Sequence, residues 1–372
     1  METAAVSGLD GGEIIFMSLL YTKMKIFHYK EKIDSLPVSV DNIMPPLHIR
    51  IKPTNVCNHN CSYCAYRMEN LQLGKDMVVK DYIPEEKMRE IISDIIEMGV
   101  KAVTFSGGGE PFCYPFLLES VKKLSGSSVK FAALTNGSKL EGEIAEYFAS
   151  YGTWLRISLD GWDDESYSSY RGVPRGEFTK VFRNISNFNK MKGRCILGGV
   201  VIVDKKNYAH IYDLVERLKN AGVNGVKIAP CLISNNAKEN NDYHSPIFND
   251  VKELISQIVD DLEDKDFDIF DSYHEQLDTF NKKYSWCPYL QINPVIGADQ
   301  NVYACHDKAY NLDNGLLGTI KDVRFKDFWF SDKSKFFRIS PVKDCNHHCV
   351  VNEKNKLILE YLNADREHLE FV

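Results

Sequence analysis

The chain has 372 residues, 44% hydrophobic and 12% aromatic, which is enough for one large and one smaller domain with buried cores. Its 45 basic and 52 acidic residues give a formal net charge of −7, which provides no electrostatic footprint for wrapping nucleic acid and disfavours a tRNA-modifying role. No apolar run reaches the roughly 18 residues of a membrane helix, and no basic flank precedes residues 14–20, so neither a membrane span nor a secretory signal is expected. We expect a cytoplasmic protein whose ten cysteines are metal ligands or buried thiols.

Apolar, β-rich runs alternate with amphipathic segments after residues 1–45, an N-terminal extension in which 17–36 is a candidate helix. We predict strands at 48–52, 102–105, 131–134, 154–159, 196–203 and 225–229, with a weak seventh at 266–269. Helices are predicted at 84–98, 114–124, 142–151, 177–191 and 208–221. This order is typical of right-handed βαβ units around a parallel sheet. The expected fold class is therefore α/β, with a partial (β/α)6 TIM-like barrel over residues 46–272.

Small or polar residues follow most of these strands. They stand at 54–57, 106–110, 135–137, 160–161 and 230–231. Because active sites in barrel-like sheets gather at the carboxyl ends of the strands, we expect these groups to face one mouth.

Three cysteines, Cys57, Cys61 and Cys64, lie on one loop directly after the first strand. Three thiolates cannot complete a tetrahedral structural site, so a metal bound here keeps a position open. In a [4Fe–4S] cluster the fourth iron would be free to chelate a substrate or cofactor. The alternatives are a zinc site with a fourth ligand such as His59, and three buried thiols.

The spacing Cys-x3-Cys-x2-Cys, with the aromatic Tyr63 before the last cysteine, resembles the signature of the radical S-adenosylmethionine (SAM) superfamily. Residues 106–111 resemble its GGE motif, 135–137 its third-strand motif, and 156–161 with 170–172 its fourth-strand segment. Alone, each is also an ordinary turn, loop or helix cap. The resemblance implies a SAM-binding [4Fe–4S] cluster on the three cysteines and SAM contacts from Tyr63, Gly108, Gly109, Glu110, Asn136, Ser158 and Arg171. Ser158 and Arg171 would hold the ribose hydroxyls and the methionyl carboxylate.

Four further cysteines, Cys287, Cys305, Cys345 and Cys349, can fully ligate one more cluster. Residues 291–295 and 301–305 form a candidate hairpin around 297–300. The segment 273–351 resembles the twitch domain, a shortened relative of the seven-cysteine SPASM domain, and implies one auxiliary [4Fe–4S] cluster in a small hairpin-plus-helix domain. The final segment, 352–372, is expected to be a C-terminal helix. A structural zinc held by the same four cysteines, or with His347 and His348 as substitute ligands, is the alternative.

Three cysteines remain outside both sets. Cys113 and Cys195 are expected in the core. Cys231 leaves the sixth strand at the predicted mouth and is a candidate hydrogen-atom donor to a substrate radical.

The resemblance implies a mechanism for SAM cleavage. SAM chelates the open iron, one electron from a donor such as flavodoxin or ferredoxin breaks its S–C5′ bond, and a 5′-deoxyadenosyl radical abstracts a substrate hydrogen atom. A fully ligated auxiliary cluster has no open site for substrate, so electron transfer is its expected role. This favours two-electron oxidation, as in twitch-bearing dehydrogenases of aminocyclitol biosynthesis.

We expect a small-molecule substrate, a sugar or nucleotide-sugar derivative. Epimerisation is the alternative if Cys231 donates a hydrogen atom. A peptide- or protein-modifying maturase, of the formylglycine or crosslinking type, is a further alternative, although the residues before the barrel are too few for the usual leader-peptide domain. The non-enzymatic alternative is a zinc-stabilised binding protein on a decayed barrel.

Overall fold

The structure is a computed structural model that describes residues 6–7, 13–14, 22–69, 71, 73–278 and 282–371. Its main sheet runs in the order β12-β11-β10-β3-β4-β5-β6-β7-β8-β9, and the neighbours from β3 to β9 pair in parallel. The parallel strands are β3 (His48–Ile51), β4 (Ala102–Phe105), β5 (Lys130–Thr135), β6 (Trp154–Leu159), β7 (Ile196–Val203), β8 (Gly225–Pro230) and β9 (Asp268–Asp271). All six predicted strands are present, and the weak seventh is β9.

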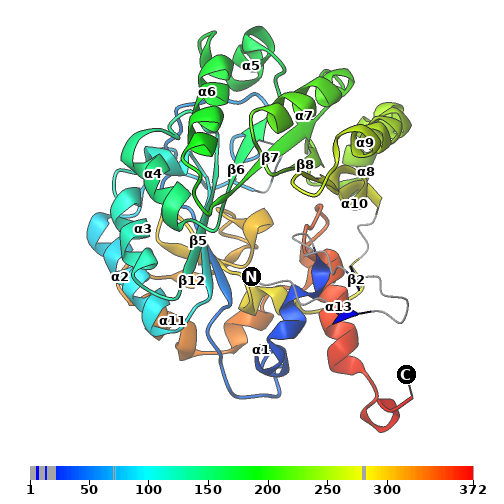
Figure 1. Cartoon of the computed structure of the whole chain (residues 1–372). Coiled ribbons are helices and arrows are strands. Elements are labelled where there is room, and N and C mark those ends of the chain that lie inside the picture. Colours follow the sequence, from blue (N-terminus) through cyan, green and yellow to red (C-terminus); the bar gives the residue numbers. More distant parts are fainter. Residues whose placement is uncertain are drawn as a thin grey trace.

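Helices cover the outer side of this curved sheet (Figure 1). Those expected from the sequence are α2 (Glu85–Glu97), α3 (Leu117–Ser125), α4 (Gly142–Tyr151), α6 (Glu177–Lys190) and α7 (Ile211–Asn220). Four others are α5 (Asp164–Arg171), α8 (Ala237–His244), α9 (Phe248–Leu262) and α10 (Ser272–Asp278). The partial α/β barrel is confirmed.

The two faces of the sheet differ in chemistry because alternate residues of a strand point to opposite sides. Ile49 and Ile51 of β3 and Ile157 of β6 are fully buried in the core between sheet and helices. The other face of the same strands carries Arg50 and Arg156, which are half-buried. This second face is the inside of the barrel.

The C-terminal hairpin extends the barrel sheet. Strand β10 (Val295–Ile296) pairs in parallel with β3 and antiparallel with β11 (Asn301–Tyr303), which pairs with β12 (Leu316–Thr319). The first hairpin strand is shorter than expected, and Gln291 lies in a 3-10 helix, η5 (Pro288–Gln291). Pro294 has no N–H for a ladder hydrogen bond, which accounts for the late start of β10.

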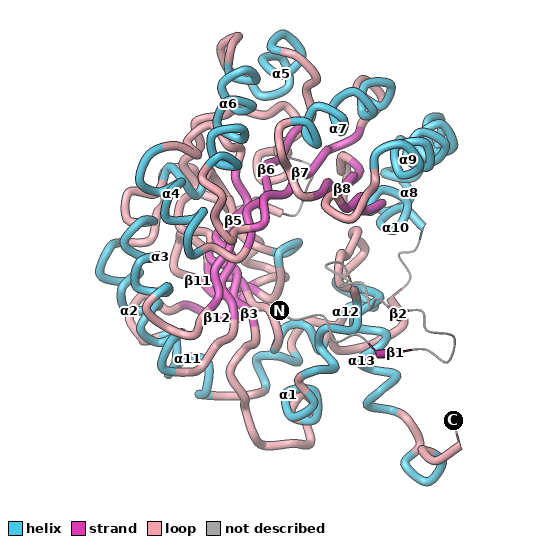
Figure 2. The backbone as a smooth tube through the Cα atoms, viewed as in Figure 1, coloured by secondary structure: helices cyan, strands magenta, loops and turns pink. Residues whose placement is uncertain are grey.

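Two connections hold the C-terminal segment to the rest of the molecule. The buried Asp94 of α2 accepts hydrogen bonds from Arg324 and from the backbone of Lys326, at the start of α11 (Phe325–Ser331). Helix α13 (Asn352–Asn363) lies beside α1 (Lys30–Asp34) and the 3-10 helix η1 (Lys23–His28) (Figures 1 and 2). A short helix, α12 (Pro341–Asp344), precedes the last two cysteines.

The expected helix at 17–36 is observed as η1 and α1, and its first five positions lie outside the described residues. Upstream of them, β1 (Val6–Ser7) pairs antiparallel with β2 (Glu13–Ile14). None of the helices in the described part of the chain is both long and apolar enough to cross a bilayer.

Candidate active site

The loop of Cys57, Cys61 and Cys64 follows β3 and is fixed to the end of α5. The amide of Asn60 donates to the carbonyl of Arg171 at 2.8 Å, and the amide of Ser62 donates to the carbonyl of Tyr170 at 2.9 Å. All three thiols are free and half-buried. The Cys57 sulfur accepts from the amide of His59 at 3.4 Å, so the loop wraps around its own first thiol.

The three thiols are chemically suited to a cluster. Burial raises the pKa of Cys57 to about 12, and burial likewise raises the pKa of Cys61, so each thiolate needs a cationic metal beside it. Within the described ranges, no three His, Cys, Asp or Glu side chains are grouped so that they could hold a single metal ion. In a cubane each thiolate binds a different iron, so the sulfurs need not converge on one point.

The glycine loop after β4 lies directly against this cysteine loop. A Cβ at Gly108 would stand 2.0 Å from the Asn55 side-chain oxygen, and a Cβ at Gly109 would stand 2.1 Å from the carbonyl oxygen of Val56. At Gly109 the nearest atoms are backbone, so any side chain there would force the two loops apart, whereas a side chain at Gly108 would have to displace the Asn55 side chain. Close backbone approach therefore explains Gly109.

The third-strand motif is bonded to the same loops. Glu110 is buried, and its carboxylate accepts from Thr135 Oγ1 at 2.7 Å, from the Asn136 amide at 2.7 Å and from the Phe112 amide at 3.0 Å. Asn136 Nδ2 donates to Asn58 Oδ1, beside Cys57, at 3.0 Å. Glu110 thus already joins two strand ends, and its predicted contact with SAM stays a prediction.

The fourth-strand motif reaches the cysteine loop through Arg171. Its guanidinium donates to Asp160 Oδ1 at 2.9 Å, to the Ser158 carbonyl at 2.7 Å and to Ser158 Oγ at 3.2 Å. A further N–H points to the Cys61 sulfur at 3.7 Å. Helix α5 places Arg171 here: an Asp163–Ser166 capping box begins the helix, and Gly172, in the left-handed conformation, ends it.

Buried polar atoms without a partner surround these loops. Within the part of the chain that the structure describes, they include Asn55 Oδ1, Tyr63 OH, Ser106 Oγ and Asp160 Oδ2. Buried polar atoms are normally hydrogen-bonded, so their gathering here fits a polar cofactor at the mouth. The strand-end groups of β3 to β6 are brought together as the sequence predicts.

The four C-terminal cysteines also lie close together. Burial raises the pKa of Cys305 well above its usual value, and Asp307, Cys349, Cys345 and Cys287 raise it further. Asn355 Nδ2 donates to the Cys287 sulfur at 3.1 Å. This set fits one fully ligated auxiliary cluster.

One network that sequence reasoning missed joins the two cysteine sets. Lys52 Nζ contacts Tyr66 OH and donates to the Gly107 carbonyl at 2.6 Å, and Tyr66 OH lies 3.2 Å from His306 Nδ1. Tyr66 stands two residues after Cys64, and His306 directly follows Cys305. Burial and Arg50 lower the pKa of Lys52 well below its usual value, whereas Asp307, Cys305 and Cys64 raise it.

The alternative histidine ligands are placed differently. His59 Nε2 lies 3.5 Å from Glu177 Oε1, against α6. His348 Nδ1 lies 2.9 Å from the Gln276 carbonyl. The ring nitrogens of His347 are buried and have no hydrogen-bond partner among the described residues, and the same holds for His59, so both histidines have ring nitrogens available to a metal.

The remaining thiols divide as follows. Cys195 is buried in the main core, as expected, whereas Cys113 is half-buried with its sulfur 3.6 Å from Asn58 Oδ1, beside the cysteine loop rather than in the core. Cys231 is buried at the end of β8, and burial raises its pKa to about 12, which keeps it a thiol with a transferable hydrogen. Its role as a donor stays a prediction.

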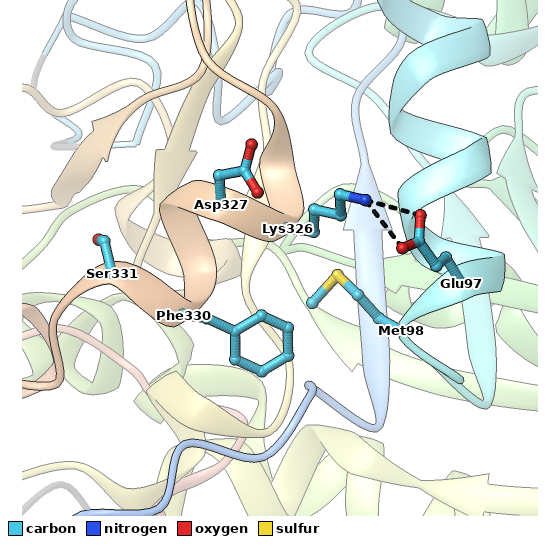
Figure 3. Close-up of a pocket in the computed structure, with 6 residues that line it drawn as sticks. All are labelled: Glu97, Met98, Lys326, Asp327, Phe330 and Ser331. Atoms are coloured by element: carbon cyan, nitrogen blue, oxygen red, sulfur yellow. Dashed lines mark hydrogen bonds and ion pairs between the residues drawn. The ribbon is translucent and has the colours of Figure 1, made fainter.

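A surface hollow lies elsewhere, between α2 and α11. Lys326 there donates to both oxygens of Glu97 at 2.8 Å (Figure 3). It holds none of the predicted site residues.

Residues 51–218 match the sequence family described as the radical SAM superfamily. A protein of Archaeoglobus fulgidus is 30% identical over 51% of this chain and 43% of its own length. A cysteine-type anaerobic sulfatase-maturating enzyme of Clostridium novyi is 24% identical over 82% of this chain and 86% of its own length. An S-adenosylmethionine-dependent nucleotide dehydratase of Lacinutrix mariniflava is 26% identical over 50% of this chain and 32% of its own length. The chain thus spans less than half the length of two of these relatives.

Solved structures share the fold. Streptococcus suis SuiB bound to precursor peptide SuiA superposes with a TM-score of 0.60 at 16% identity, over 86% of this chain and 73% of SuiB. The anSMEcpe structure with bound AdoMet superposes with a TM-score of 0.57 at 18% identity, over 85% of this chain and 96% of that one. We conclude that residues 51–218 are a radical SAM domain, with the [4Fe–4S] cluster and SAM that this family uses, and that the chain shares the fold of SuiB and anSMEcpe.

Proposed function

We propose that this radical SAM enzyme oxidises a small-molecule substrate, a sugar or nucleotide-sugar derivative, by two electrons. The observation that supports oxidation is the Lys52–Tyr66–His306 network, which connects the residues beside Cys64 to those beside Cys305. When bound, the cofactors supply a 5′-deoxyadenosyl radical that removes a hydrogen atom, and an iron–sulfur acceptor for one electron. Loss of one hydrogen atom, one electron and one proton converts an alcohol to a carbonyl.

The chain's own residues have separate roles in this proposal. Cys57, Cys61 and Cys64 hold the SAM-binding cluster, and Arg171, with Ser158, orients SAM at the mouth. Cys287, Cys305, Cys345 and Cys349 hold the auxiliary cluster. Buried Lys52, whose pKa is lowered, links the two sets and fixes the glycine loop through the Gly107 carbonyl.

A peptide- or protein-modifying maturase is the second candidate function. Two similarities favour it: the sequence match to the Clostridium novyi sulfatase-maturating enzyme extends over most of both chains, and the fold is shared with SuiB. Epimerisation is the third, with Cys231 as hydrogen donor. A one-electron donor such as flavodoxin or ferredoxin is the expected partner in each case.

The auxiliary cysteines provide the test of oxidation. The reconstituted enzyme, SAM and dithionite are incubated anaerobically with candidate sugars and peptides deuterated at carbon. We expect deuterium in 5′-deoxyadenosine and a carbonyl product from a sugar substrate. Cys287→Ala should still form 5′-deoxyadenosine but lose the carbonyl product, whereas the core control Cys195→Ala should retain both. Deuterium from peptides alone would replace the small-molecule proposal by the maturase.

A further inference from the structure

The inside of the barrel carries a group of cations that the chemistry of SAM does not use. Sheet register places Arg50 on the inner face of β3, Arg156 on that of β6 and Lys227 on that of β8. Arg156 precedes the SAM-mouth residue Ser158 by two positions on the same face, about 7 Å deeper along the strand. Lys354 of α13 joins them, and we call these four residues the inner cations.

The inner cations lie near one another. Burial lowers the pKa of Lys227 to about 8, and Arg156, Arg50 and Lys354 lower it as well, whereas Glu275 opposes them. Burial also lowers the pKa of Lys354, with Arg50 and Arg156 among the further causes. Residues from three strands and one helix thus repel one another across one space.

Aromatic rings contact three of these cations. The Arg156 guanidinium lies 4.7 Å from the ring centroid of Trp154, Lys227 Nζ lies 5.9 Å from that of Phe270, and Lys354 Nζ lies 5.9 Å from that of Tyr289. Such contacts orient a cation but contribute no negative charge.

The acidic residues that face this group are Glu275 and Asp307. The Glu275 carboxylate already forms an ion pair with Lys23, whose Nζ lies 2.7 Å from it. In the described residues Lys227 and Lys354 form no ion pair, and Arg50 Nε is buried without a hydrogen-bond partner. Burying Lys227 and Lys354 without an ion-pair partner is costly, so an anion that enters here is bound favourably. All four inner cations are half-buried, so solvent reaches them.

We propose that Arg50, Arg156, Lys227 and Lys354 bind an anionic group of the substrate, a phosphate or a carboxylate, inside the barrel below the SAM mouth. The inference rests on the proposed function only in assigning this anion to the substrate. The inner cations hold the substrate by its anionic end, while the carbon that loses hydrogen lies nearer the mouth. In a chain with a net charge of −7, this positive interior selects anionic substrates.

Anion binding is measured by calorimetry on the reconstituted enzyme with saturating SAM, so that the mouth is filled. Pyrophosphate and succinate are the probes, and binding of either supports the proposal: pyrophosphate alone identifies a phosphate group, and succinate alone a carboxylate. We expect Arg156→Gln and Lys227→Gln each to weaken binding by about tenfold or more, the scale of one lost charge-assisted hydrogen bond. The exposed controls Arg183→Gln and Lys252→Gln make the same charge change on the outer helices and should leave the affinity unchanged.

Circular dichroism checks that each variant folds, and Lys227→Gln carries the test if Arg156→Gln does not fold. Two results overturn the proposal: neither probe binds, or the variants lose auxiliary iron while their anion affinity is unchanged. The second result would mean that the inner cations balance the negative charge of the auxiliary cluster and do not bind the substrate. Failure of the proposed function, by contrast, shows as a missing carbonyl product or as deuterium transfer from peptides alone, and it is measured separately.

Discussion

Removing the buried guanidinium of Arg171 should destabilise the enzyme strongly. Arg171 and Asp160 are 4% and 1% exposed and form an ion pair at 2.9 Å. In Arg171→Gln, the Asp160 carboxylate keeps only the amide of Gly161, at 2.9 Å, as a hydrogen-bond donor among the described residues, and its Oδ2 already has no donor. Breaking one side of a buried pair leaves an uncompensated charge, which costs about 3–5 kcal/mol. We expect a loss of that size in the free energy of unfolding.

The pH dependence identifies the charge responsible. Burial raises the pKa of Asp160 and Arg171 opposes this, so the pKa rises further in Arg171→Gln. In the variant, protonation of Asp160 at low pH then removes its uncompensated charge and restores part of the free energy of unfolding. The difference in stability is therefore largest near neutral pH and narrows as pH falls toward about 5. The double variant Arg171→Gln/Asp160→Asn should recover much of the loss.

Urea unfolding of the anaerobic holoenzyme, followed by circular dichroism at about pH 7.5 and about pH 5, measures these differences. Arg183→Gln, on the exposed side of α6, is the matched control and should change stability by less than about 0.5 kcal/mol. A loss below about 1 kcal/mol for Arg171→Gln, or additive effects in the double variant, would refute the buried-pair account.

Two further substitutions examine the loops at the mouth. Gly109→Ala places a Cβ 2.1 Å from the carbonyl oxygen of Val56 and should displace the cysteine loop, with loss of bound iron. Gly126→Ala, whose Cβ would stand 3.6 Å from its nearest neighbour, should retain the iron, and equal iron contents in the two variants would contradict the close approach of the loops. Glu110→Gln places an amide N–H₂ group opposite the hydrogen-bond donors Thr135 and Asn136. The free energy of unfolding should fall by about 1–3 kcal/mol in the same urea assay. An unchanged urea midpoint would show that the carboxylate does not hold the strand ends together.

The strands and the mouth were predictable from the sequence because both depend on local chemistry. Apolar β-rich runs separated by polar strand ends indicated β3 to β8, and the ends of β3 to β6 do meet at one mouth. Helix α8 was missed because it is short and polar, and α5 because its signal is a capping box rather than an apolar stripe, whereas α9 carries an apolar stripe that was overlooked. The first hairpin strand was predicted to start at 291, which is too early, because Pro294 was overlooked.

The inner face of the barrel was missed although its signal is present. In residues 48–52, His48, Arg50 and Lys52 alternate with isoleucines, so one face of a central strand is cationic. His306 lies more than 200 residues after Lys52 and Tyr66 in the sequence, and only the fold brings it into contact with them.

Anaerobic reconstitution with iron and sulfide, followed by dithionite and SAM, tests the central claim most directly. The account predicts about eight irons per chain, from two four-iron clusters, and formation of 5′-deoxyadenosine. Cys57→Ala should abolish SAM cleavage, while Cys195→Ala should not. Two zinc ions per chain and no 5′-deoxyadenosine would contradict the account.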